Sequence, residues 1–119
     1  MKNLFSWVEI PATDMNRAVK FYGKVLNLKL EAMDWGSEKM AFFPGDGGAI
    51  SEAPGFKPAE NGVLVHIHAG NELDAMLDRI REAGGQIIRP KTKIEAEGRG
   101  YFALFKDSEG NRLGVYGDR

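Results

Sequence analysis

The sequence contains one pattern twice, and this internal repeat limits the possible folds more than any other feature. Residues 7–10 (Trp-Val-Glu-Ile) and residues 64–67 (Leu-Val-His-Ile) lie 57 positions apart, and both read as short strands. A polar turn follows each of them, and then apolar residues at the spacing of an amphipathic helix. The chain therefore predicts two equivalent modules.

Both helices carry signals at their ends. Apolar positions recur through residues 15–25 in the first copy and residues 73–83 in the second. Asp14 and Asn71 are the predicted N-caps, because a side-chain oxygen there can accept hydrogen bonds from the free amides of the first turn. The glycines at 84–85 are predicted to end the second helix.

Each helix is followed by an extended segment and by two strands joined through a glycine-containing turn. Gly47 and Gly110 occupy the same place in the two turns, 63 positions apart, where a hairpin needs a positive φ angle. The expected strand pairs are residues 40–43 with 48–50 and residues 102–105 with 112–115.

The repeat also divides the chain. Its offset grows by six residues, and we place this insertion mostly in residues 91–100 as a flap over the second module. Residues 53–61 contain two prolines and no periodicity, so they are the predicted linker. The modules are then residues 4–52 and 62–117, within a single domain of 119 residues.

The predicted fold class is α+β. A βαβββ module has one helix for one face of its sheet, so it cannot bury the other face alone. Two tandem modules side by side would form a curved mixed sheet of about eight strands. The helices would lie outside, and the concave side would be a cleft.

Composition excludes several classes of function. Sixteen Lys and Arg against seventeen Asp and Glu give a formal charge of -1, so neither nucleic acid nor a membrane is an expected partner. Without cysteine there is no disulfide, zinc-thiolate site, iron-sulfur cluster or thiol nucleophile. No apolar run approaches the roughly 20 residues of a membrane span, and the first residues lack a signal-peptide pattern. We expect a cytoplasmic location.

Three separated features resemble the vicinal oxygen chelate superfamily, which holds glyoxalases, bleomycin-resistance proteins, fosfomycin-resistance enzymes and extradiol dioxygenases. They are the duplication itself, residues 8–14 (VEIPATD) followed by 17–22 (RAVKFY), and residues 105–111 (FKDSEGN). The chain is most similar to the branch of predicted enzymes related to lactoylglutathione lyase. Members of the superfamily are commonly homodimers, so the resemblance implies a homodimer.

The resemblance also implies where a metal would be bound. Metal-dependent members take His, Gln or Glu ligands from the first and fourth strands of each module. Those positions fall here on Trp7, Ser51, Leu64 and Gly114, and none of these side chains is an effective ligand. We therefore expect neither the family metal nor another cofactor.

Strand alternation assigns other side chains to the cleft. If Trp7 faces it, Glu9 does so too, and His66 occupies the position equivalent to Glu9 in the second module. A facing carboxylate and imidazole would form a proton-transfer pair near neutral pH, so Glu9 and His66 are the candidate catalytic residues. Both could instead line the cleft without catalysis, or have structural roles alone.

His66 and His68 raise a second possibility, a displaced metal site. Imidazoles two residues apart share one face of a strand, and Glu9 could add an oxygen ligand. Against this site, their backbone positions lie about 6.5 Å apart, which is far for one ion.

Aromatic residues complete the candidate binding site. Trp7, Phe43 and Tyr116, with Tyr101 near the flap and His68, are the predicted ligand-binding residues. The other strand phenylalanines are assigned to the core: Phe42, Phe102 and Phe105. The basic residues around the flap could attract an anionic substrate or be solvated: Arg89, Lys91, Lys93 and Arg99.

Two functions remain open. The leading hypothesis is a glyoxalase-related lyase or isomerase that acts on a small organic molecule without the family metal. The alternative is a protein that binds or sequesters such a molecule without turnover, as bleomycin-resistance proteins do.

Overall fold

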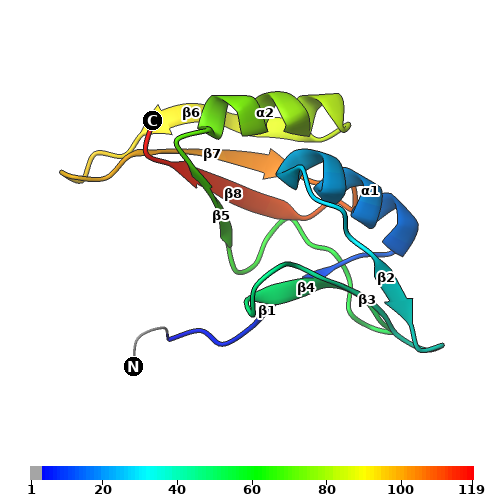
Figure 1. Ribbon diagram of the computed structural model, residues 1–119. Helices are drawn as coiled ribbons and strands as arrows, with labels where there is room; N and C mark the ends of the chain where they lie inside the picture. The colour runs from blue at the N-terminus through cyan, green and yellow to red at the C-terminus, as the bar shows by residue number, and fades with distance from the viewer. Residues whose placement is uncertain (1–3) are drawn as a thin grey trace.

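In the computed structural model, which describes residues 4–119, the chain forms two four-stranded sheets with one helix on each (Figure 1). The first sheet has the order β1 (Val8–Pro11), β4 (Gly48–Glu52), β3 (Lys39–Phe42) and β2 (Ala32–Asp34), and carries α1 (Met15–Leu26). The second has the order β5 (His66–Gly70), β8 (Arg112–Gly117), β7 (Tyr101–Lys106) and β6 (Gln86–Lys93), and carries α2 (Leu73–Glu82). In both, the first strand pairs in parallel with the fourth and the remaining pairs are antiparallel.

The α+β class and the βαβββ repeat are confirmed, but the single curved sheet is not. β1 and β5 each lie at the end of their own sheet, and within residues 4–119 no strand ladder joins them. The side chains of Val8, Ile10 and Val65 line pockets between these two strands. Pockets therefore lie where two paired strands would be only about 4.8 Å apart.

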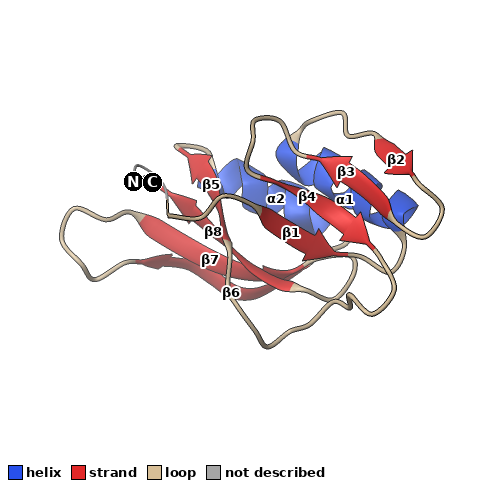
Figure 2. Cartoon of the chain, turned by 90° about the horizontal axis from the view of Figure 1, so that it is seen from below, coloured by secondary structure: helices blue, strands red, loops and turns tan. Residues whose placement is uncertain are grey.

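Both helices lie on the same side of the molecule, so each sheet has a face with a helix and a face without one (Figure 2). We call these the covered face and the open face. Side chains of the covered faces form the core, whereas the open faces point to the opposite side of the molecule.

One of the two predicted helix caps is correct. The Asp14 side chain accepts a hydrogen bond from the amide of Arg17 (3.1 Å). Asn71 is not a cap, because the Glu72 amide bonds to the carbonyl of Ala69 and the helix begins one residue later than predicted. Neither helix of residues 4–119 is long and apolar enough to cross a membrane.

The predicted flap is shorter than expected. β6 continues to Lys93 with two register shifts, so the first three residues of the predicted segment belong to a strand. The connection to β7 comprises residues 94–100. The two strands of this hairpin have eight and six residues, so both are longer than any strand of the first sheet.

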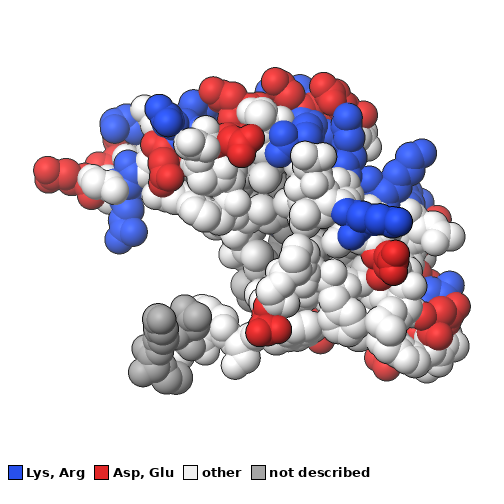
Figure 3. Space-filling view, in the orientation of Figure 1, with Lys and Arg blue, Asp and Glu red and all other residues white. Residues whose placement is uncertain are grey.

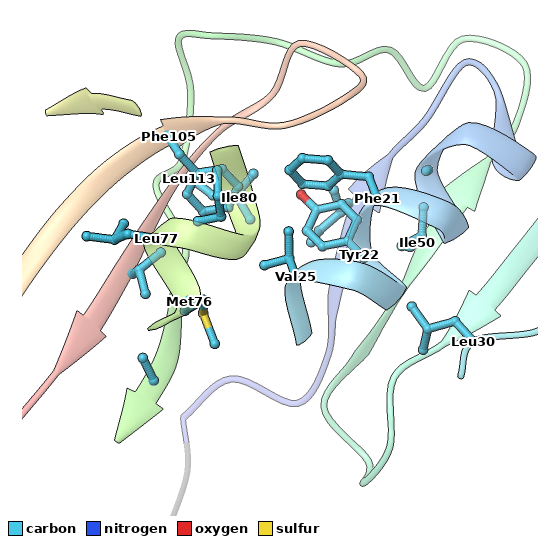
Figure 4. Packing of buried hydrophobic residues seen from close by; sticks show 14 of the residues in the cluster. Phe21, Tyr22, Val25, Leu30, Ile50, Met76, Leu77, Ile80, Phe105 and Leu113 are labelled. Atoms are coloured by element: carbon cyan, nitrogen blue, oxygen red, sulfur yellow. The ribbon is translucent and has the colours of Figure 1, made fainter. Parts of the chain in front are cut away.

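The two modules share one hydrophobic core (Figure 4). The ring of Phe21 on α1 stacks on Phe105 of the other module, with centroids 6.3 Å apart, and meets Tyr22 edge-on at 5.0 Å. Val25 and Ile80 bring the two helices into the same cluster, and both are fully buried. Because side chains of both modules fill this core, neither sheet can tilt without opening it.

A buried polar contact also joins the modules. The Tyr22 hydroxyl donates a hydrogen bond to Oδ2 of Asp107 in the β7–β8 turn (2.5 Å). Burial and the nearby Asp107 charge raise the pKa of Tyr22, so the hydroxyl keeps its proton. Asn111 of the same turn donates to the carbonyl of Pro11 at the end of β1 (2.8 Å).

Glu109, in the same turn, binds the start of α1. Its carboxylate accepts hydrogen bonds from the backbone amides of Thr13 (2.9 Å) and Asp14 (3.0 Å) and from Nε of Arg17 (2.7 Å). Burial acts to raise the pKa of Glu109, but these hydrogen bonds outweigh it and lower the pKa to about 2. An anion at a helix N-terminus is also favoured by the helix dipole.

Replacing Glu109 by Gln is expected to lower the free energy of unfolding by about 1–2 kcal/mol at pH 7, because charge-assisted hydrogen bonds are lost. Since the folded pKa lies below the ordinary 4.5, this stabilisation is complete above pH 4.5 and disappears as the pH falls towards 2. Urea denaturation of both proteins between pH 7 and pH 2.5 measures the difference.

The matched control is Glu82→Gln, which removes an exposed ion pair with Lys24. It should change stability by less than about 0.5 kcal/mol. A Glu109→Gln effect that stays constant across this pH range would contradict the role assigned to the carboxylate.

Candidate ligand-binding site

The open faces of the two sheets form the candidate site. The space-filling view shows a hollow between the two parts of the molecule, with mainly uncharged side chains along it and charged side chains gathered on the outer surface (Figure 3). Residues of β1 and β5 alternate as predicted: Ile10 and Ile67 contact the core, whereas Glu9, His66 and His68 are exposed on the open face.

Module one, the sheet β1–β4 with α1, contributes an exposed aromatic cluster. Phe42 lies between Trp7 and Trp35, with ring centroids 6.0 and 6.5 Å away. The three side chains are 43%, 41% and 56% exposed, respectively. Beside them, Ser51 donates a hydrogen bond to Oε1 of Glu9 (2.6 Å), which holds the carboxylate in one orientation.

Module two, the sheet β5–β8 with α2, contributes a second aromatic wall. His68 stacks on Tyr116 with centroids 5.7 Å apart, and His66 meets Phe102 edge-on at 6.3 Å. A pocket of about 430 Å³ lies over this wall, which is within the usual size range of small-molecule sites. Its lining residues are His66, Ile94, Arg99, Phe102 and Tyr116.

The imidazole of His66 lies directly over Gly114 on the neighbouring strand. The two residues are paired in register, and a Cβ built on Gly114 would overlap Nδ1 and Cε1 of His66. Any other residue at position 114 would therefore displace this ring. The His66 ring therefore fills the space that a metal-binding side chain at position 114 would occupy.

The described residues do not fit the family metal. Besides Gly114, the implied ligand positions hold Trp7, whose ring is in the aromatic cluster, Leu64, and Ser51, whose hydroxyl is engaged with Glu9. Across residues 4–119 no three His, Asp or Glu side chains come close enough to hold an ion. The alternative site at Glu9, His66 and His68 is therefore not assembled.

Glu9 and His66 share the open side of the molecule, but no direct contact joins them. Among the hydrogen bonds and ion pairs of residues 4–119, the Glu9 carboxylate has Ser51 as its partner. Glu9 lines a pocket between the modules, whereas His66 lines the pocket over module two. A proton transfer between them would need a bound molecule that spans both positions, so their catalytic role stays a prediction.

Four aromatic residues lie on the face of the sheet opposite to the predicted one: two were predicted to line the site and two to lie in the core. Phe43 contacts Tyr22 on the covered side (6.0 Å), and Tyr101 packs against the core. Phe42 and Phe102 were assigned to the core and instead lie on the open face, because they pair with Ala49 and Tyr116. Phe105 is fully buried, as predicted.

The basic residues around the flap separate in the same way. On the covered side, Lys91 binds Asp74 (3.2 Å), and the ammonium groups of Lys91 and Lys93 lie over the Tyr101 ring. On the open side, the guanidinium of Arg89 lies over the Phe102 ring at 5.0 Å, and Arg99 lines the adjacent pocket. The sequence alone did not predict which of these four residues lie on which face of the sheet.

The pockets between the modules were not predicted. One, of about 520 Å³, is lined chiefly by apolar residues of β1, β5 and the segment after α1, including Leu28. The other, of about 240 Å³, lies beneath the linker and includes Glu9 and Arg112. Their lining residues come from both copies of the repeat. The sequence pattern within one copy therefore cannot predict these pockets.

Gly114→Ala is expected to lower the free energy of unfolding by about 1–3 kcal/mol, because the added methyl group displaces the His66 ring. In a His66→Ala background the same change should cost less than about 0.5 kcal/mol. Denaturation of the native protein, both single variants and the double variant gives this coupling.

Gly47→Ala is the control, since a Cβ at Gly47 meets open space. The prediction of a positive φ angle at Gly47 is wrong, because Gly45 has it in this turn, whereas Gly110 has it as predicted. Gly47→Ala should have little effect in either background. Equal costs of Gly114→Ala with and without His66 would show that the ring does not occupy this space.

No curated protein sequence matches the chain, but many solved structures share its fold. A glyoxalase/bleomycin resistance protein from Albidiferax ferrireducens is 22% identical with a TM-score of 0.72, covering 97% of this chain and 99% of that one. TnmS3, an antibiotic binding protein from Streptomyces, is 22% identical with a TM-score of 0.66, at 97% and 95% coverage. The fosfomycin resistance protein FosX from Listeria monocytogenes is 20% identical with a TM-score of 0.64, at 98% and 90% coverage.

At these identities the likeness shows the fold alone. The family is shown independently by a family model that matches residues 4–115. The chain belongs to the Glyoxalase/Bleomycin resistance protein/Dioxygenase superfamily.

Proposed function

We propose that this protein binds a planar, largely apolar small organic molecule on its open face. The observation that carries the proposal is the pair of aromatic walls on the open faces, one of which includes Trp7 at an implied metal-ligand position. Trp7 and Phe42 supply one wall, and Phe102 and Tyr116 supply the other. Flat aromatic surfaces favour flat partners, since stacking adds to the burial of apolar area.

Exposure of these side chains supports a binding role over a structural one. Trp7, Trp35 and Phe42 each leave more than a third of their surface in contact with solvent, and they are contiguous. Such a patch is costly in water unless a ligand or partner covers it. An antibiotic binding protein among the structures of the same fold fits this proposal, although its likeness concerns the fold alone.

Catalysis of the lyase or isomerase type is the second candidate. It is favoured by the contacts of its two residues: Ser51 donates a hydrogen bond to Glu9, and the His66 ring lies over Gly114 and meets Phe102 edge-on. Fixed donors and acceptors are what general acid-base catalysis requires. In this mechanism a bound molecule would contact both groups, with one accepting and the other returning a proton.

Binding can be tested with a neutral planar probe, 2-naphthamide, by isothermal titration calorimetry. Trp7→Ala and Tyr116→Ala are each expected to weaken its binding about tenfold or more, because each removes one stacking surface. The control Leu28→Ala removes an apolar side chain from the pocket of about 520 Å³ between the modules, away from the two aromatic walls, and should change affinity less than twofold. Loss of affinity in Leu28→Ala equal to that in the aromatic variants would contradict the proposed site.

Turnover can be tested with Glu9→Gln and His66→Ala, each compared with the native protein on an extract of small metabolites analysed by mass spectrometry. If the protein is an enzyme, some conversion seen with the native protein should fall about 100-fold or more in both variants. The opposite outcome is that the protein binds 2-naphthamide but both variants leave every conversion unchanged. In that case Glu9 and His66 do not catalyse a reaction, and the binding function stands alone.

A further inference from the structure

We infer that the ligand carries an acidic group, a carboxylate in the simplest case, which is held by the arginines of module two. This inference rests on the proposed binding function and adds the chemical class of the ligand. It follows from how the basic side chains of module two are distributed between the two faces of its sheet.

Two arginines lie at the aromatic pocket. Arg89 on β6 places its guanidinium over the Phe102 ring (5.0 Å). Arg99, in the loop 94–100, lines the same pocket as Phe102 and Tyr116. A guanidinium stacked on an aromatic ring keeps its N–H groups directed outward in the ring plane, where they can bind a carboxylate in bidentate fashion.

The lysines of the same strand are used elsewhere. Lys91 binds Asp74 on α2, and Lys91 and Lys93 both lie over Tyr101 on the covered side. Within residues 4–119 the ion pairs include neither Arg89 nor Arg99, and Glu95 and Glu97 of the flap loop form none with Arg99. On β6 and in the loop after it, the cation with an acidic partner, Lys91, is therefore on the covered side, whereas Arg89 and Arg99 are at the pocket and form no ion pair among the described residues.

A third arginine lies further along the same open face. Arg112 precedes Gly114 by two residues on β8, so the two share a face of the strand. Its Nε is buried and has no hydrogen-bond partner among the described residues. On the same face of the paired strand, Lys106 binds Glu60. Arg112 lines the same pocket as Glu9, so of these three arginines Arg89 and Arg99 are the ones at the aromatic pocket that a ligand's acidic group would meet.

The other wall has the opposite charge. Glu9 lies on the open face of module one with its carboxylate held by Ser51. An anionic group beside Glu9 would be repelled, whereas the arginines of module two would attract it. The acidic group of the ligand therefore points to module two, and its apolar part is left for Trp7 and Phe42.

Three aromatic acids of increasing size test the inference, each paired with its neutral amide: benzoate, 2-naphthoate and anthraquinone-2-carboxylate. Calorimetry with the whole protein should show at least one acid bound about tenfold or more tightly than its amide. In the double variant Arg89→Gln, Arg99→Gln, that acid should lose about tenfold or more in affinity, while its amide changes less than twofold. Raising the salt concentration should weaken the acid alone.

Lys93→Gln is the matched control, because it removes one positive charge from the covered side of the same strand. It should leave the affinity for the acid within twofold, and circular dichroism should show that all variants are folded. Equal affinities for acid and amide, or an equal loss in Lys93→Gln, overturn the acidic-ligand inference while the binding function stands. Failure of every acid and amide to bind overturns both.

Discussion

The open site depends on the contact between the β7–β8 turn and the start of α1. No strand ladder joins the two sheets, so the angle between their open faces is set by the shared core and by this turn. Glu109 binds two backbone amides ahead of the helix, and Asn111 binds the carbonyl of Pro11 at the end of β1. The segment that carries Trp7 and Glu9 is therefore held by the module that carries His66.

The sequence predicted the repeat, the order of elements and the faces of β1 and β5, because polar and apolar residues alternate strictly in those two strands. It failed where neighbouring residues are both aromatic. In Phe42-Phe43 and Tyr101-Phe102 a period of two fits either face equally well, and the pairing register decides. Phe42 pairs with Ala49 and Phe102 with Tyr116, and these partners place both side chains on the open face.

Other features of the site depend on contacts that no local pattern contains. His66 lies over Gly114, and Glu109 binds Arg17, across 48 and 92 residues of chain. A glycine at a position implied for a metal ligand shows only that the ligand is missing. That an imidazole occupies the space depends on the register of β5 with β8. Likewise, the separation of Arg89 from Lys91 requires the bulges in β6, which the sequence does not mark.

An open face with aromatic walls and without effective metal ligands selects a different kind of molecule from one that holds a metal ion. A metal ion binds a ligand through a few directional bonds to oxygen or nitrogen atoms. Aromatic walls bind a ligand by burying its apolar surface, which depends little on the particular atoms that form that surface. Such walls alone discriminate poorly between flat molecules, so specificity must come from polar groups at their rim. Here the rim is asymmetric, with Glu9 on one module and arginines on the other. In the proposed site a charged ligand would therefore lie in one direction only, and this direction would determine which of its atoms meet His66.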